Sequence, residues 1–386
     1  MLLLTGVAIA QISPEIEKLP RSQRSIADVL SSTRISGYVS TSALFNLGPK
    51  GVVLPGRTYD GTDKLDKINF DVVNLVLDRP PERGDWTAGY KVELLFGPDA
   101  NVLGSNSRVG DNSQSDFAIK QAYIALRTPL SPDLTFQLGV FDKIVGYEAF
   151  NSPVNPNYTR SYGYFLEPFT HTGVLARYDA SSAWSFAGGV AGAYDAPINA
   201  EGVEVGNNHR FGLQTFMAQA TYRRPEGEHC MDGMTLSSGL VYGLNSNLNS
   251  VSDRNPRLLT YVGFEAPTPF EGVRSGFSID YRTADPAVGG SEYANSVAAY
   301  LSWQINETLR LNGRAEYARG SSDTWTTANP SKDRLLGLTS TLDIHLWDDV
   351  LARAELRWDN DTNERGVSFG DRDSALTAAF NVVYQF

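Results

Sequence analysis

The chain has 386 residues, a single cysteine (Cys230) and a formal net charge of −11 from 33 basic and 44 acidic residues. The acidic balance and the lack of any basic run exclude a nucleic-acid-binding protein, and one cysteine excludes an internal disulfide. Hydrophobic residues make up 41% of the chain, yet no run approaches the roughly 20 apolar residues that a membrane helix needs. A spanning β-strand needs only about 10 residues with alternating faces, so the composition still allows a membrane β-barrel.

The N-terminus carries a pattern typical of secretion. Residues 1–10 form an apolar stretch that ends in Ala-x-Ala at Ala8 and Ala10, which predicts a signal peptide shortened at its charged end. A short buried N-terminal segment is the alternative. Residues 11–32 follow as an expected periplasmic tether, in which Ser22–Leu30 reads as a short helix.

From there on, apolar and polar residues alternate in segment after segment, which predicts β-strands. Between Thr308 and Tyr317, for example, leucine, glycine, alanine and tyrosine alternate with arginine, asparagine and glutamate. About 16 such segments occur, and an even number suits a closed antiparallel barrel whose two ends lie on the same side. The expected strands are 33–46, 66–78, 86–97, 116–128, 133–141, 170–180, 183–195, 209–223, 233–244, 256–267, 272–284, 293–304, 307–319, 333–347, 349–360 and 373–386.

The connections between these strands alternate strictly in length. Short ones such as 128–133 and 347–349 alternate with long ones such as 97–116 and 142–169. Short periplasmic turns and long extracellular loops are the sequence trace of an outer-membrane barrel, and aromatic residues near the strand ends suit its interfacial girdles. We therefore expect an all-β fold in which residues 33–386 form a single transmembrane antiparallel β-barrel in the outer membrane of a Gram-negative cell.

The polar faces of the strands carry charges that must point into the lumen, because a charge at the lipid midplane costs a few kcal/mol. A barrel of about 16 strands is wide enough to hold water inside. The arginines of two late strands are therefore candidates for lining the pore, and ion pairs within the wall are an equally good interpretation. These arginines are Arg310, Arg314, Arg353 and Arg357.

The third long connection, 142–169, has a residue pattern of its own, and long structured loops are usually functional. In a barrel of 16 strands it is placed to fold inward and narrow the lumen. Its charges would then face the arginine-rich strands, and opposed charges across a constriction sort solutes by charge. They are Asp142, Lys143, Glu148, Arg160 and Glu167. Alternatively, the loop folds outward or packs on the wall through its aromatic residues.

Several motifs in this region resemble those of the OmpL-like β-barrel porin family. They are Gly139-Val-Phe141, Gly146-Tyr-Glu148, Asn157-Tyr-Thr-Arg160-Ser, Pro168-Phe-Thr-His171-Thr-Gly173 and the charged segment Glu355-Leu-Arg-Trp-Asp359. The resemblance spans roughly residues 33–386 and implies a barrel porin, with His171 as an anchor for the long loop. The terminal Phe386 resembles the end of outer-membrane barrels generally, where an aromatic residue is part of the signal read by the barrel-assembly machinery.

The first hypothesis for function is a porin, a water-filled channel in the outer-membrane lipid through which small hydrophilic solutes or ions diffuse passively. The second is a non-conducting barrel that serves as an adhesin or envelope scaffold. An enzyme is not expected, because none of the four histidines lies in a nucleophile-elbow context. No metal or cofactor motif is present. A homotrimer is possible by analogy with barrels of this size.

Overall fold

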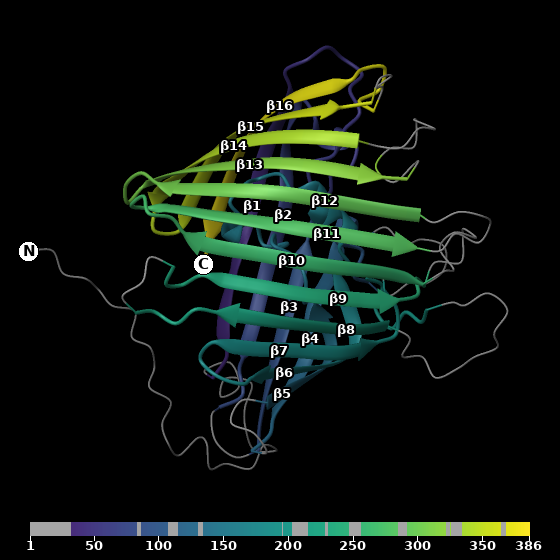
Figure 1. Ribbon diagram of the computed structural model, residues 1–386, viewed down its shortest axis with the longest axis vertical. Coiled ribbons are helices and arrows are strands. Elements are labelled where there is room, and N and C mark those ends of the chain that lie inside the picture. The colour runs from purple at the N-terminus through teal and green to yellow at the C-terminus, as the bar shows by residue number, and fades with distance from the viewer. Residues whose placement is uncertain are drawn as a thin grey trace, which may run out of the picture.

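A computed structural model describes residues 32–82, 86–106, 115–129, 134–194, 196–202, 215–227, 231–246, 256–284, 292–321, 325, 334–363 and 368–386. In it, sixteen antiparallel strands form one closed barrel in which each strand pairs with its neighbours in sequence (Figure 1). The predicted fold and strand number are confirmed. The proposed signal peptide at 1–10 and the helix at Ser22–Leu30 lie outside the described residues.

The strands are 8 to 14 residues long, enough for tilted membrane-spanning β-strands. They are β1 Arg34–Asn46, β2 Lys67–Arg79, β3 Thr87–Phe96, β4 Phe117–Arg127, β5 Leu134–Asp142, β6 Thr170–Asp179, β7 Trp184–Ala191, β8 Thr215–Arg223, β9 Thr235–Gly243, β10 Arg257–Pro267, β11 Val273–Ala284, β12 Glu292–Gln304, β13 Leu309–Gly320, β14 Arg334–Trp347, β15 Val350–Asp361 and β16 Ser374–Gln385.

Most of the predicted boundaries agree with the strands to within two residues. The segment 183–195 is an exception, because β7 ends at Ala191 and the chain then turns toward the loops. The segment 209–223 begins as a strand at Thr215, and its first six residues lie outside the described part of the chain. The loops also contain short helices that the alternating pattern did not predict: α2 Pro98–Leu103, α3 Tyr162–Leu166 and the 3-10 turns η3 Thr62–Lys64 and η4 Ser152–Val154.

The first and last strands close the barrel. β1 pairs with β16 in a register that sets Tyr38 opposite Gln385, and Phe386 continues the pairing. Its backbone N–H donates to the Gly37 carbonyl at 3.0 Å, and its carbonyl accepts from the Gly37 N–H at 2.8 Å. Closure leaves no free sheet edge, which is what a β-structure in lipid requires.

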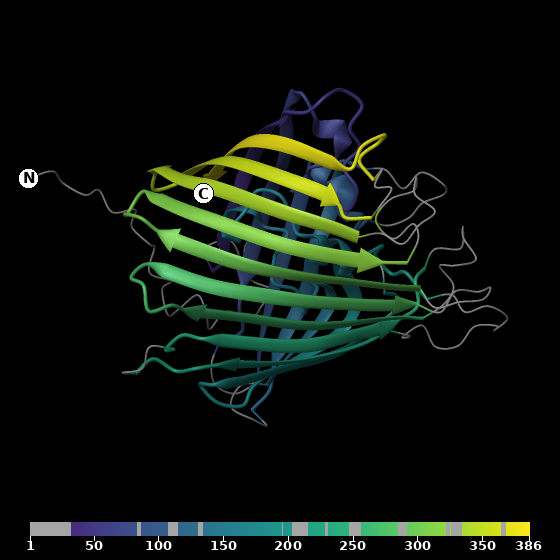
Figure 2. The ribbon, with the colours of Figure 1, turned by 45° about the horizontal axis from the view of Figure 1, so that its top comes forward.

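The two ends of the barrel differ. One end carries the short turns and the C-terminus, and the other carries the long loops, here called L1 (47–66), L2 (97–116), L3 (143–169), L4 (192–214), L7 (321–333) and L8 (362–373) (Figure 2). Exposed aromatic side chains lie at the turn end, as in an interfacial girdle: Trp86, Trp184, Trp303, Trp347 and Tyr384. Tyr194, which the sequence pattern places near the end of the predicted strand 183–195, is instead buried inside, because it lies in L4 beyond the end of β7.

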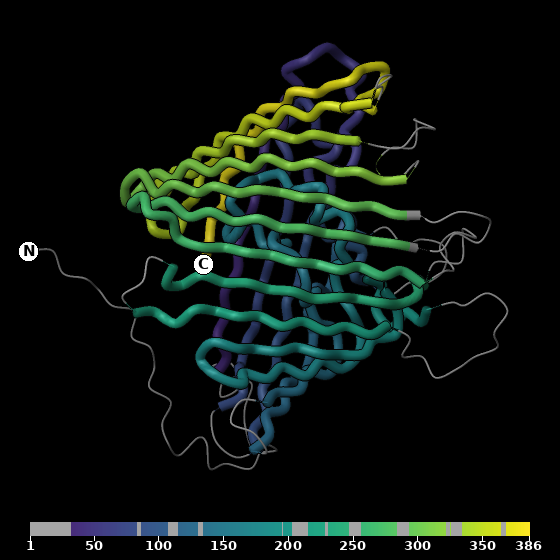
Figure 3. The backbone as a smooth tube through the Cα atoms, viewed as in Figure 1, coloured from purple at the N-terminus to yellow at the C-terminus, as the bar shows by residue number. Residues whose placement is uncertain are grey.

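L3 lies inside the barrel, where the tube of Figure 3 shows it behind the front wall. Its helix α3 lies against the inner side of β11, β12 and β13. No helix among the described residues is long and apolar enough to cross a membrane. The buried core of this protein lies in the filled part of the lumen, where L3 and L1 meet the wall.

Candidate functional site: the lumen and its third loop

L3 is held in its inward fold by its own side chains. The Arg160 guanidinium donates to three backbone carbonyls of the same loop, those of Ala149 at 3.0 Å, Tyr158 at 2.6 Å and Phe150 at 2.7 Å. Arginine is suited to bind several carbonyls at once, because its guanidinium group has five N–H donors in a rigid, planar arrangement. Arg160, proposed as a constriction charge, is therefore buried within L3 and holds the loop in shape.

The family-like Gly146-Tyr-Glu148 segment begins this fold. Gly146 has φ +116°, and a Cβ there would meet the Glu167 carboxylate, so only glycine fits. Glu148 accepts a hydrogen bond from the Ser161 N–H at 2.7 Å and pairs with the Arg314 guanidinium on β13 at 2.8 Å. Ser161 in turn caps α3 by accepting from the Tyr164 N–H.

Three arginines of the wall bind L3 through its backbone carbonyls. Arg314 donates to the Thr159 carbonyl at 2.7 Å, and Arg357 donates to the Arg160 carbonyl at 2.6 Å. Arg353 donates to the carbonyls of Ser152 at 2.8 Å and Asn155 at 2.7 Å. L3 thus reaches from its own strands, β5 and β6, to β13 and β15 of the wall.

Carboxylates of the barrel wall accept hydrogen bonds from the backbone N–H groups of the same loop segment. Glu355 accepts from the Tyr158 and Thr159 N–H groups at 2.7 and 3.1 Å, and Glu316 accepts from the Tyr162 N–H at 2.6 Å. The Tyr162 hydroxyl donates to Asp359 at 2.8 Å. An irregular loop buried inside a barrel needs such partners, because unpaired backbone groups away from water are costly.

This arrangement corrects one expectation. The side chains of Arg314, Arg353 and Arg357 are 0% exposed and pair with wall carboxylates, and Arg314 also pairs with Glu148 of L3, so they do not line an aqueous path. Their inward direction was correctly predicted from strand parity. The sequence could not show that L3 comes into contact with them, which turns expected pore charges into anchors. Removing one partner of such a buried pair costs about 3–5 kcal/mol.

L1 also folds inward and joins the network. Arg57 donates to Asp359 at 2.6 Å and also pairs with Asp60. Lys64 bridges Asp71 of β2 and Asp99 of α2, at 2.7 and 2.6 Å. L1 and L2 are thereby tied to the wall beside L3.

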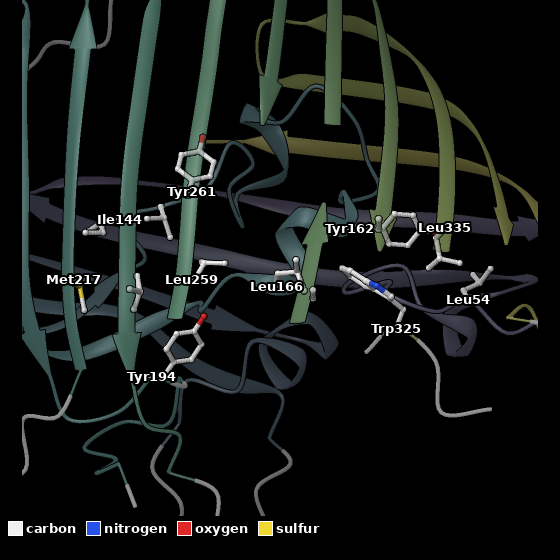
Figure 4. Packing of buried hydrophobic residues seen from close by; sticks show 14 of the residues in the cluster. Leu54, Ile144, Tyr162, Leu166, Tyr194, Met217, Leu259, Tyr261, Trp325 and Leu335 are labelled. Carbon is white, nitrogen blue, oxygen red and sulfur yellow. The ribbon is translucent and has the colours of Figure 1, made fainter. Parts of the chain in front are cut away.

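An aromatic cluster fills the space between L1, L3 and L7. Tyr59 of L1 packs edge-on against Phe150 and Tyr164, with ring centroids 5.1 and 5.9 Å apart. Trp325 of L7 packs against Tyr162 at 5.5 Å, and Figure 4 shows the two side by side near Leu335. The expected packing of L3 tyrosines on the wall therefore coexists with inward folding.

Asp142 at the end of β5 and the remaining charged residues of L3 form ion pairs with residues near them. Asp142 pairs with Lys120 of β4, and Lys143 pairs with Glu167. Burial raises the pKa of Glu167 to about 7, against the lowering effect of the Lys143 ammonium, and Glu148 adds to the rise. Glu167 also hydrogen-bonds Asp280 on β11, so two carboxyl groups meet where L3 touches the wall.

His171 lies buried at the start of β6, and its Nδ1 is 3.3 Å from the Ala193 carbonyl in L4. Its ring lies 6.1 Å from that of Phe141 on β5. This contact joins the start of β6 to L4.

The opposite side of the lumen is open. A cavity of about 360 Å³ lies between L3 and strands β8 to β13 on the turn side, bordered on L3 by Tyr147 and Asn155. Four charged side chains line it: Arg223, Glu265, Arg274 and Arg310. Arg274 pairs with Glu265 at 2.6 Å, and Arg310 pairs with the buried Asp343 at 3.2 Å while its side chain stays 33% exposed. Arg310 alone among the four predicted pore arginines lines this space.

Sequence reasoning missed most of this cavity, because small side chains make it. Thr235, Ser237 and Gly263 line its wall on β9 and β10. Gly276 makes room for Tyr147, whose hydroxyl would collide with a Cβ there, and Tyr147 stacks on Tyr300 at 4.1 Å. A run of small inward residues on β9–β11 was the available signal. Among the described residues, no group of three or more His, Cys, Asp or Glu is placed to hold a metal ion.

Comparisons with known proteins agree with this architecture. The family model described as "Putative beta-barrel porin-2, OmpL-like" matches residues 32–386. No curated protein sequence matches the chain. Solved structures of similar fold include an anion-selective porin from Comamonas acidovorans (TM-score 0.58, 12% identity, 92% of this chain and 99% of that one). A second is the outer membrane channel DcaP of Acinetobacter baumannii (TM-score 0.57, 13% identity, 92% of this chain and 97% of that one). A third is OmpT of Vibrio cholerae in its trimer form (TM-score 0.58, 10% identity, 92% of this chain and 99% of that one).

Proposed function

Because the chain belongs to the OmpL-like β-barrel porin family, we propose that it is an outer-membrane porin through which small hydrophilic solutes and ions diffuse passively. The observation that carries this proposal is the division of the lumen by L3. One side is closed by anchored loop backbone, and the other holds a polar cavity of about 360 Å³. A narrow path beside L3 is the form that a size-selective channel would take.

The cavity lining supports a preference for anions. It presents three arginines, Arg223, Arg274 and Arg310, against one carboxylate, Glu265. Arg274 and Glu265 largely offset each other, which leaves Arg223, and Arg310 with its partner Asp343, as the other charges facing solutes. Asp343 weakens the field of Arg310, so we expect a moderate preference.

A second candidate function is a non-conducting barrel that acts as an adhesin or envelope scaffold. The observation that favours it is that loops fill the lumen on the side where L3 is anchored. There L1, L3 and L7 bury aromatic side chains such as Tyr59, Tyr164 and Trp325. In that case the loops would carry the function by binding a partner at the cell surface.

We further propose that the protein assembles as a homotrimer and that Phe386 is read by the barrel-assembly machinery. The trimer form of the Vibrio cholerae neighbour supports the first point by analogy. The half-exposed ring of Phe386, which lies 6.4 Å from that of Tyr384 on the outer face, supports the second. A channel rather than an enzyme is proposed, since no nucleophile with a paired base was identified in the cavity lining.

Conductance in a planar bilayer tests the proposal. The purified protein is expected to give stable single-channel steps, and a salt gradient is expected to give a reversal potential of the sign for anion preference. A folded, heat-modifiable barrel that gives no steps would contradict the porin and favour the scaffold. A cation-selective reversal potential would contradict the assignment of Arg223 and Arg310 as the dominant charges.

A further inference from the structure

Two arginines on the outside of the barrel have no role in the channel. Arg319 near the end of β13 and Arg334 at the start of β14 are directly opposite each other in the strand register, and both are exposed. They share the outward face with exposed Ala315, Tyr317 and Leu338. Like charges directly opposite on one face of a sheet repel, so this pair is unfavourable unless an anion lies between them.

Nothing among the described residues supplies that anion. Neither guanidinium forms an ion pair with a described residue, and that of Arg319 lies 5.9 Å from the centroid of the Tyr293 ring on β12. The ring adds an apolar face beside the two guanidinium groups. A planar fork of N–H donors binds the oxygens of a phosphate or a carboxylate in pairs, and the position of the two arginines in the membrane decides between these groups.

The position of the pair in the membrane points to a lipid headgroup. Arg319 lies two residues beyond Tyr317 toward the loop end, where aromatic side chains mark the outer interface. Arg334 is the first residue of its strand at the same end. The guanidinium groups therefore lie at the headgroup level of the outer leaflet, beside the hydrocarbon and outside the lumen.

Below the pair, the outer wall is hollowed. A groove of about 500 Å³ runs across β12 to β16 and is lined mostly by apolar atoms. The small residues Ala299, Gly313 and Ala315 form its floor, and the leucines of the neighbouring strands form its sides. Ala315 and its partner Leu338 each lie four residues from the arginines, about 13 Å at 3.3 Å per residue.

We propose that this outer face binds the phosphorylated, acylated glycolipid of the outer leaflet, lipopolysaccharide. Its phosphate lies between Arg319 and Arg334, and one acyl chain lies in the groove over Ala315. Charge complementarity selects this occupant, because a second copy of the chain would need a carboxylate at the arginine pair and an apolar ridge in the groove at once. The site is independent of conduction through the lumen.

The test uses the full-length protein refolded from the denatured state in detergent, so that no cellular lipid is carried along. Binding of lipid A is measured by native mass spectrometry for the wild type, for Arg319→Gln/Arg334→Gln and for Ala315→Phe, which fills the groove. The matched control is Lys50→Gln/Arg372→Gln, which removes the exposed charge of Lys50 in L1 and the partly exposed charge of Arg372 in L8 at the same end. A shift in electrophoretic mobility on heating verifies that each variant is folded. If the double variant does not fold, Arg334→Gln alone is used in its place.

We expect the arginine variant to lose about tenfold or more in affinity for lipid A, the groove variant to bind more weakly than wild type, and the control to bind as wild type does. Equal binding by the arginine variant and the control would overturn the proposal. Equally tight binding of inorganic phosphate or of deacylated lipid A would also overturn it, since the site would then be a phosphate site only. A change of oligomeric state without loss of lipid A would assign the face to a second copy instead.

Discussion

The two halves of the lumenal wall differ in composition. On β13–β15 the inward positions carry charged residues that alternate in sign along the strand, such as Arg353, Glu355, Arg357 and Asp359. Where β8–β11 border the cavity, small neutral residues such as Thr235, Ser237 and Gly263 are interspersed with a few charged ones, and this part of the wall is here called the neutral half. L3 covers most of the charged half, and the neutral half borders the open cavity.

The difference shows that charge density in the wall of a barrel does not by itself mark the solute path. Charged side chains on the inner wall can satisfy the backbone of a loop that has no regular structure of its own. The loop then covers them, and the path runs past the neutral half, where the few remaining charges have more influence. Arg310 and Arg314 show this within four residues of one strand, since the first faces the cavity and the second is covered.

The largest effect is expected from breaking an anchor. Arg357→Leu leaves Glu316 and Asp359 short of a partner, at a cost of about 3–5 kcal/mol, so L3 should detach from the wall. We expect trypsin to cut the folded barrel after Lys143 or Arg160, which are partly or fully buried in the wild type. Arg310→Leu, which changes a residue of β13 that faces the cavity, is the control and should gain no cut. A protected L3 in Arg357→Leu would contradict the anchoring role.

The pH dependence of stability sharpens the comparison, because two carboxyl groups on the loops have a raised pKa. Burial raises the pKa values of Glu167 and of Asp99 to about 7. Between the ordinary carboxyl range and about 7, the folded state holds protons that the unfolded state has lost, so stability falls as pH rises through this window. The thermal midpoint in detergent should therefore be lower at about pH 8 than at about pH 5. Glu167→Gln should flatten the slope, and an unchanged slope would show that Glu167 does not titrate there.

At the cavity, the change of a single charge should alter selectivity and leave the fold unchanged. Arg310→Gln removes one cavity charge, and Asp343 keeps its second partner, Arg353. The reversal potential under a salt gradient should move toward cations by several millivolts, whereas Arg372→Gln on L8 should leave it unchanged. Equal shifts in both variants would mean that outer-loop charge, and not the cavity, sets the preference.

The smallest effect is expected from one neutral contact of L3. The Tyr158 hydroxyl donates to Ser42 on β1 at 2.9 Å, and Ser42 separately donates to Asp71. Tyr158→Phe removes one hydrogen bond and should cost about 1 kcal/mol. The trypsin assay should then show slightly faster cutting of L3 than in wild type. If Tyr158→Phe exposed L3 to trypsin as much as Arg357→Leu does, the main anchor of L3 would lie at β1.

Much of the fold could be predicted from the sequence, because a two-residue alternation repeated in sixteen strands fixes both the strands and their inward faces. The inward direction of Arg314 and Arg353 followed from parity alone. The partners of these arginines did not, since L3 makes its contacts through backbone carbonyls, and any residue supplies a carbonyl. The cavity was missed for a similar reason, because Gly263 and Gly276 form it by the space they leave.

The most direct test of the account compares single-channel conductance of the wild type and Arg314→Gln in planar bilayers, with Tyr317→Phe, on the outer face of the same strand, as control. Arg314 holds L3 through Glu148 and the Thr159 carbonyl, so its loss should free the loop and enlarge the aperture. The account predicts discrete steps for wild type and control, and larger or noisier steps for Arg314→Gln. Identical conductance in all three proteins would contradict it, because L3 would then not set the aperture of the channel.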